Sequence, residues 1–200
     1  MNKTALFFPG QGSQYVGMAK DLHVAYPSVR QLYQLASDEI GVDIAKLSFE
    51  GPSEELKKTR FTQPAILLHS LAVLTALQEN LPQFDYAAGH SLGEYGALAV
   101  TKALSFEDAI KAVVKRASLM EEACQVHPST MAAILGLDAE KVATICDVAS
   151  STGIVVPANF NSSVQVVISG EPRAVKEAVV LAREAGAKRA VLLEVGGAFH

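Results

Sequence analysis

Near the middle of the chain lies the sequence Gly89-His90-Ser91-Leu92-Gly93-Glu94-Tyr95, which is the strongest indicator of its fold. It carries the pattern Gly-x-Ser-x-Gly between a short apolar segment, residues 84–88, and a segment of helix-forming residues, 92–104. The glycines on either side of the serine have no Cβ atom, so the backbone can turn sharply from a strand into a helix. Such a turn exposes the serine hydroxyl and directs the next backbone N–H toward a reacting oxygen. The stretch therefore predicts an α/β fold in which Ser91 is a nucleophile.

The overall composition is typical of a globular protein, with 50% hydrophobic residues and a net charge of −4 over 200 residues. Nucleic-acid-binding proteins usually carry a basic surface, so we expect no nucleic-acid partner. The longest apolar run, residues 65–77, is interrupted by His69 and Ser70 and is shorter than the roughly 18 residues of a membrane span. The first residues also lack the pattern of a signal peptide. We therefore expect a cytoplasmic protein with no membrane partner.

The sequence also indicates that the protein binds no permanent cofactor and no metal. The loop of residues 9–14 is rich in glycine, but it lacks the third glycine of a dinucleotide motif and the Gly-Lys-Ser/Thr of a phosphate loop. Cys124 and Cys146 do not have the spacing of a metal site. We expect both cysteines to be reduced thiols, and we expect the glycine loop to offer a backbone N–H to a neighbouring site.

Strands and helices alternate along the first part of the chain. The apolar segment 4–8 predicts a strand, and residues 27–47 predict a pair of amphipathic helices. We expect Ser53 to cap a helix N-terminus, and Pro64 to lie in the first turn of a helix that ends near Leu77. The short strand and the Ser91 turn follow. This order predicts a parallel sheet with its chemistry at the carboxyl ends of the strands.

The pattern changes after residue 127. A helix over 105–123, capped by Ser105, precedes the change. The segments that follow predict strand, helix, strand, strand, helix and strand, over residues 131–137, 139–148, 154–160, 164–168, 172–185 and 189–195. This β-α-β-β-α-β order is that of a ferredoxin-like unit. The sequence therefore predicts two subdomains with a cleft between them.

Six motifs, spread over the whole chain, resemble those of one enzyme family. They are Gly10-Gln11-Gly12-Ser13-Gln14, Thr62-Gln63-Pro64-Ala65, Gly89-His90-Ser91-Leu92-Gly93-Glu94, Arg116, Ala158-Asn159-x-Asn161 and Gly197-Ala198-Phe199-His200. Their sequence and order resemble the malonyl-CoA:acyl-carrier-protein transacylase family, which includes relatives among the acyltransferase domains of polyketide synthases.

The resemblance implies the fold in more detail. It implies an α/β-hydrolase-like, parallel-sheet catalytic subdomain formed by residues 1–127 plus 196–200. A ferredoxin-like small subdomain, residues 128–195, would be inserted into it. Members of this family continue well past the histidine of the last motif. We therefore expect the chain ending at His200 to be C-terminally truncated, with its catalytic subdomain incomplete.

The resemblance also implies an activity, [acyl-carrier-protein] S-malonyltransferase. The enzyme would move a malonyl group from malonyl-CoA, its substrate, to the phosphopantetheine thiol of acyl carrier protein, its partner, in fatty acid or polyketide biosynthesis. Ser91 would form an acyl-enzyme, and His200 would act as the base that takes its proton. The backbone N–H groups of Gln11 and Leu92 would form the oxyanion hole.

The resemblance also implies residues that bind the acyl group of the substrate. A malonyl group has a free carboxylate, which the planar guanidinium of Arg116 can bind through two parallel hydrogen bonds. Phe199 resembles the malonyl-preferring form of its motif, in which a bulky ring leaves little space for an α-methyl branch. Gln63 and Asn159 are expected to support substrate binding. His90 is expected to brace the turn, because adjacent residues of a strand point to opposite faces.

Two other functions stay open at this point. A serine carboxylesterase or thioesterase shares the Gly-x-Ser-x-Gly pattern and could use an acidic residue between positions 91 and 200. Arg116 and the Gln11 loop argue against it. A non-catalytic module that docks a carrier protein is the second alternative.

Overall fold

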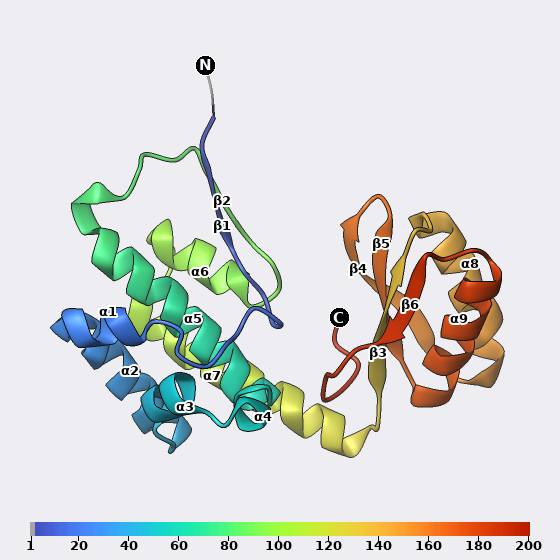
Figure 1. Ribbon diagram of the computed structural model, residues 1–200, viewed down its shortest axis with the longest axis horizontal. Helices are drawn as coiled ribbons and strands as arrows, with labels where there is room; N and C mark the ends of the chain where they lie inside the picture. The colour runs from blue at the N-terminus through green and yellow to red at the C-terminus, as the bar shows by residue number, and fades with distance from the viewer. Residues whose placement is uncertain (1–2) are drawn as a thin grey trace. The chain divides into compact units, whose positions relative to one another are not determined.

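The computed structural model describes residues 3–200 and shows a mixed α/β protein (Figure 1). It consists of two compact units, which meet in sequence between Leu119 and Met120. The first unit has a parallel sheet and the second has an antiparallel sheet. Within residues 3–200, no helix combines the length and the hydrophobicity that crossing a membrane would require.

The first unit is mostly helical. Its elements are β1 (Ala5–Phe8), α1 (Lys20–Ala25), α2 (Pro27–Ile40), α3 (Ile44–Glu50), α4 (Ser53–Leu56), α5 (Thr59–Leu77), the 3₁₀ turn η1 (Gln78–Asn80), β2 (Tyr86–Gly89), α6 (Gly93–Val100) and most of α7 (Phe106–Val126). The core lies around α5, where Leu67, Leu68 and Leu71 are at most 1% exposed. Helix α5 is apolar on nearly all sides because α1, α2, α3 and α6 all pack against it.

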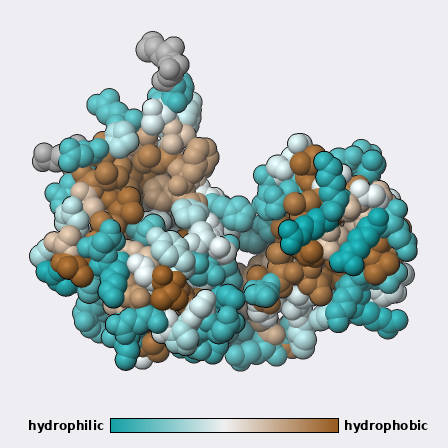
Figure 2. All heavy atoms as spheres, in the orientation of Figure 1, coloured by the Kyte–Doolittle hydropathy of each residue, from teal (hydrophilic) through white to brown (hydrophobic). Residues whose placement is uncertain are grey.

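The two strands of the first unit confirm the predicted parallel pairing. β1 pairs with β2 in register, with Phe8 opposite Gly89. Neither strand is fully buried, although both are mostly apolar: Tyr86 of β2 is 57% exposed and Phe7 of β1 is 80% exposed. Helix α6 packs against the side of the sheet that carries Phe8, and Phe7 points the other way. Figure 2 shows apolar surface on this part of the first unit.

Two of the predicted helix starts are wrong and one is confirmed. Helix α5 begins at Thr59, so Pro64 lies inside the helix, where it removes one backbone hydrogen bond. The helix nevertheless begins upstream of Pro64, because the side chains of Thr59 and its neighbours are buried and their burial offsets the lost hydrogen bond. Ser53 is the first residue of α4 rather than its cap, which is Pro52. Ser105 does cap α7, because its Oγ accepts a hydrogen bond from the Asp108 N–H at 3.0 Å.

The second unit follows the predicted order of elements. These are β3 (Thr130–Leu135), α8 (Ala139–Ala149), the 3₁₀ turn η2 (Ser150–Thr152), β4 (Val155–Ser162), β5 (Gln165–Gly170), α9 (Pro172–Glu184) and β6 (Arg189–Leu192). The sheet order is β4-β5-β3-β6, with every neighbouring pair antiparallel. Helices α8 and α9 bury one face of this sheet, including Ile134, Val166 and Ile168.

The other face of this sheet carries a smaller apolar cluster around Met131, Val167 and Phe199. The segment after β6 is held there by a hydrogen bond from the Ala198 N–H to Ser129 Oγ at 2.8 Å. Residues 196–200 therefore pack with the second unit. Gly197 also lies against Cys124 of α7, and the predicted grouping of residues 196–200 with residues 1–127 stays a prediction.

Candidate active site

Ser91 lies at the tip of a strand-turn-helix, as its motif predicts. β2 ends at Gly89 and α6 begins at Gly93, and Ser91 between them has a φ of 55°. A positive φ is rare for a residue other than glycine and is typical of strained functional positions. The turn is closed by hydrogen bonds from the Gly93 N–H to the His90 carbonyl at 3.0 Å and from the Glu94 N–H to the Ser91 carbonyl at 3.2 Å.

The glycines of the motif are required by close backbone contacts. A Cβ atom on Gly89 would overlap the backbone of Gly93, and one on Gly93 would overlap the carbonyl oxygen of Phe8. These contacts bring α6 directly against both strands. On the neighbouring loop, a Cβ atom on Gly10 would meet the His90 imidazole. His90 therefore lies against the Gly10 loop, a position in which it can brace the turn.

Gly93→Ala is expected to lower the free energy of unfolding by about 1–3 kcal/mol, the usual effect of overpacking. The added methyl group would meet the Phe8 backbone, which cannot yield as a flexible side chain can. Chemical denaturation followed by circular dichroism measures this loss. Leu98→Ala is the matched control, because Leu98 is 41% exposed on the same helix and its change should stay within about 0.5 kcal/mol. Equal losses in both variants would contradict the role of Gly93.

Three of the predicted site residues are joined by hydrogen bonds. Arg116, from α7, donates from Nη2 to Ser91 Oγ at 2.9 Å and from Nη1 to Gln63 Oε1. Gln63, from α5, is only 1% exposed, so it offers a fixed acceptor to the guanidinium. The structure thus places a cation directly beside the Ser91 hydroxyl.

The environment of Arg116 strengthens its attraction for an anion. Partial burial lowers the pKa of Arg116, and this effect outweighs the opposing charges of Tyr95 and Glu94, which raise that pKa. An arginine stays protonated at any ordinary pH. Because water is partly excluded, its charge acts in a medium of lower dielectric constant than the solvent. Sequence reasoning missed the effect of Tyr95 and Glu94, although both residues belong to the motif around Ser91.

The two predicted oxyanion-hole residues lie at the same edge of the first sheet. Gln11 is three residues beyond Phe8, and Leu92 is three residues beyond Gly89, and these two strand residues are paired. Within residues 3–200, neither the Gln11 N–H nor the Leu92 N–H donates a hydrogen bond. Both donors can therefore serve a negatively charged oxygen. The Gln11 side chain donates to Thr59 Oγ1 at 3.4 Å, which ties the loop to α5.

Three predicted site residues belong to the second unit. On β4, the pairing with β5 shifts by one residue between Pro157 and Asn159, so that Asn159 is paired with Val167. A bulge of this kind redirects side chains. It turns Asn159 to the face of the sheet on which Phe199 packs, because paired residues share a face. His200 is exposed and has a φ of 63°.

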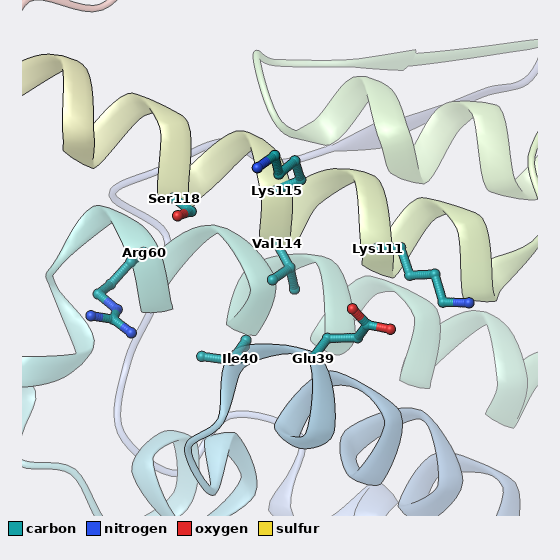
Figure 3. Close-up of a pocket in the computed structure, with 7 residues that line it drawn as sticks. All are labelled: Glu39, Ile40, Arg60, Lys111, Val114, Lys115 and Ser118. Carbon is teal, nitrogen blue, oxygen red and sulfur yellow. The ribbon is translucent and has the colours of Figure 1, made fainter.

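A surface cavity of about 220 Å³ in the first unit contains none of the predicted site residues (Figure 3). It is lined by Glu39, Ile40, Arg60, Lys111, Val114, Lys115 and Ser118. Figure 3 shows the Arg60, Lys111 and Lys115 head groups pointing in different directions, so they do not converge on one ligand. Among residues 3–200, no group of His, Cys, Asp and Glu side chains is placed to hold a metal ion.

Both the sequence and the structure of this chain are similar to those of known proteins. The model of the acyl transferase domain family matches residues 6–200. The malonyl CoA-acyl carrier protein transacylase of Bacillus subtilis (strain 168) is 46% identical over 201 residues, which covers 100% of this chain and 63% of the relative. The chain therefore spans just under two thirds of the length of this relative.

The structure of this chain is also similar to solved structures of two such enzymes. The acyl-carrier-protein S-malonyltransferase of Burkholderia pseudomallei 1710b is similar with a TM-score of 0.90 and 44% identity, over 100% of this chain and 65% of that protein. A malonyl-transacylase solved in complex with its type II polyketide-synthase acyl-carrier protein is similar with a TM-score of 0.89 and 44% identity. That match covers 98% of this chain and 64% of the other.

Proposed function

This chain belongs to the acyl transferase domain family, and from this premise we propose that it transfers a malonyl group from coenzyme A to the phosphopantetheine thiol of an acyl carrier protein. The names of the similar proteins from Bacillus subtilis and Burkholderia pseudomallei support the substrate. The complex of a similar transacylase with its carrier protein supports the partner.

The observation that carries this proposal is the contact of 2.9 Å between Arg116 Nη2 and Ser91 Oγ. Hydrolysis of a simple ester has no use for a guanidinium beside the nucleophile. An acyl group that ends in a carboxylate does, because that carboxylate can accept two parallel hydrogen bonds from one arginine. Malonyl is such a group, and a single methylene group separates its carboxylate from the thioester carbonyl carbon that Ser91 would attack.

In the first half-reaction, Ser91 Oγ attacks the thioester carbon of malonyl-CoA and the C–S bond breaks. His200 takes the hydroxyl proton and returns it to the departing thiolate, so that free coenzyme A leaves and a malonyl ester of Ser91 remains. The N–H groups of Gln11 and Leu92 stabilise the oxyanion, each such donor being worth about 2.7–4 kcal/mol in comparable sites.

In the second half-reaction, the phosphopantetheine thiol of the carrier protein attacks the malonyl ester. His200 takes the thiol proton and delivers it to Ser91 Oγ as the C–O bond breaks. The products are malonyl carrier protein and the free serine. The supporting role of Gln63 is consistent with its hydrogen bond to Arg116. Asn159 and Phe199 complete the proposed site, with the Phe199 ring restricting branched acyl groups.

We also propose the two subdomains expected from the sequence, an α/β-hydrolase-like part formed by residues 1–127 plus 196–200 and a ferredoxin-like part formed by residues 128–195. The parallel pairing of β1 and β2, followed by the Ser91 turn, supports an α/β-hydrolase-like catalytic part. The antiparallel order β4-β5-β3-β6, with α8 and α9 on one face, supports a ferredoxin-like second part.

Transfer to the carrier protein tests the function directly. The chain is mixed with malonyl-CoA and phosphopantetheinylated acyl carrier protein, and the intact mass of the carrier is measured. We expect a malonyl group on the carrier, and none on a carrier that lacks phosphopantetheine. Release of malonate without transfer would favour a thioesterase. Carrier binding without any acyl transfer or acyl-enzyme would favour a docking module.

A further inference from the structure

We propose that Ser13 is a positioning residue of the oxyanion hole. Its hydroxyl would hold the peptide unit between Gly10 and Gln11 so that the Gln11 N–H points out of its loop, toward the reacting oxygen. Gln14 would assist by holding the next peptide unit. This inference rests on the proposed function, and it gives roles to two residues of the glycine loop to which that function assigns none.

The side chain of Ser13, rather than its backbone, closes the turn at the tip of this loop. Ser13 Oγ donates a hydrogen bond to the Gly10 carbonyl at 2.7 Å. Among the backbone hydrogen bonds of residues 3–200, none joins the Ser13 N–H to that carbonyl. Gly10 is buried, so the hydroxyl satisfies a carbonyl that water reaches poorly.

This hydrogen bond also fixes the direction of the Gln11 N–H. The Gly10 carbonyl and the Gln11 N–H belong to one trans peptide unit, which is planar, so the two groups point in opposite directions. Because the carbonyl is held toward Ser13, the N–H is directed away from it. Within residues 3–200, this N–H donates no hydrogen bond. An oxyanion hole requires such a donor, with its direction fixed before the reaction begins.

The same peptide unit begins at a residue that packs against the turn of Ser91. A Cβ atom on Gly10 would meet both the imidazole and the backbone carbonyl of His90, the residue directly before Ser91. The loop and this turn are therefore in contact within the first unit. A rotation of the peptide unit after Gly10 would move the Gln11 N–H relative to Ser91.

Two further contacts hold the residues around Gln11. The Gly12 N–H donates to Gln14 Oε1 at 2.8 Å, which fixes the peptide unit on the other side of Gln11. The bond from the Gln11 side chain to Thr59 Oγ1 attaches the loop to α5, where Thr59 is 5% exposed. Ser13 should have the largest effect on catalysis, because it alone of these contacts holds the peptide unit that contains the Gln11 N–H.

Ser13→Ala tests the inference through the rate of acylation. Formation of the malonyl-enzyme is followed in single turnovers by rapid quenching and intact mass, over a range of malonyl-CoA concentrations. We expect the maximal rate to fall about tenfold, less than the roughly 10²–10³ lost when an oxyanion-hole donor is removed. The malonyl-CoA concentration that gives half of this rate should change less than about twofold, because the oxyanion forms only in the transition state.

Transfer from the malonyl-enzyme to the carrier protein should slow by a similar factor, because its tetrahedral intermediate places an oxyanion in the same hole. Ser13→Thr keeps the hydroxyl, and its extra methyl group has room because Ser13 is exposed. This variant should recover most of the acylation rate. A purely structural role of Ser13 would not confine the loss to the two chemical steps.

Ser151→Ala is the matched control. Ser151 Oγ also donates to the carbonyl three residues upstream, that of Val148 at 3.0 Å, and Ser151 is exposed in the second unit. Its variant should be acylated at the unmodified rate, and circular dichroism checks that all variants are folded. The inference is overturned if Ser13→Ala is as fast as the unmodified chain, or if Ser13→Thr is as slow as Ser13→Ala. A change in the half-saturating concentration alone would also overturn it.

Gln14→Ala keeps the inference testable if Ser13→Ala does not fold. It should slow acylation about threefold with the half-saturating concentration unchanged, since one of the two peptide units beside Gln11 is released. An unchanged rate in this variant would count against the inference. If the unmodified chain forms a malonyl-enzyme and the variants match it, only the inference fails. If the unmodified chain forms none, the proposed function fails and the inference fails with it.

Discussion

Ser91→Ala is expected to abolish formation of the malonyl-enzyme while leaving the chain folded. The oxygen that this change removes is the atom to which the acyl group would be attached. In a comparable serine enzyme, loss of the nucleophile lowers kcat by a factor on the order of 10⁶. The fold should persist for two reasons. Alanine and serine both carry a Cβ atom and meet the same steric strain at a φ of 55°. The hydrogen bonds that close the turn are made by the backbone.

Intact mass after mixing with malonyl-CoA measures this result, and circular dichroism checks the fold. Ser118→Ala is a suitable control, because Ser118 is an exposed serine of α7 that lines the separate surface cavity. It should be malonylated as fully as the unmodified chain. Persistent malonylation of Ser91→Ala at another residue would refute the assignment of the nucleophile.

Arg116→Ala is expected to reduce malonyl transfer by about a hundredfold or more and to preserve acetyl transfer. Breaking a buried ion pair by removing one partner costs about 3–5 kcal/mol. Arg116 is only partly buried, so we expect the lower end of this range, about 3 kcal/mol, or roughly two decades of kcat/KM. An acetyl group has no carboxylate to lose. Its transfer should even rise, because Ser91 Oγ no longer accepts a hydrogen bond from the guanidinium.

The measurement is kcat/KM for malonyl-CoA and acetyl-CoA in both proteins. Arg116→Lys is an informative companion, since it keeps the charge without the planar pair of donors. It should recover part of the malonyl rate. A fall of the same factor for both thioesters would mean that Arg116 is structural, and the argument for a malonyl substrate would lose its physical basis.

Several features of this protein follow from local sequence alone. The Gly-x-Ser-x-Gly turn and the Ser105 cap were predicted at the right residues, because both depend on chemistry within a few positions of the chain. The β-α-β-β-α-β order of the second unit was predicted within a few residues for the same reason, since periodicity is a local property.

The contacts of the candidate site depend on how distant elements of the chain pack together. Arg116 reaches Ser91 across 25 residues of sequence and Gln63 across 53, through the packing of α5 and α7 in the first unit. Resemblance to a family pointed to these residues, but nothing in their spacing could predict that Arg116 contacts Ser91.

Packing also overruled local preference elsewhere in the chain. Helix α5 continues through Pro64, because burial of its first turn offsets the lost hydrogen bond. The bulge before Asn159 turns that side chain to the Phe199 face of its sheet. Local patterns determine which element forms, because a strand or helix is stabilised by near neighbours. The partners of each side chain depend on free energies gained only when distant elements pack together.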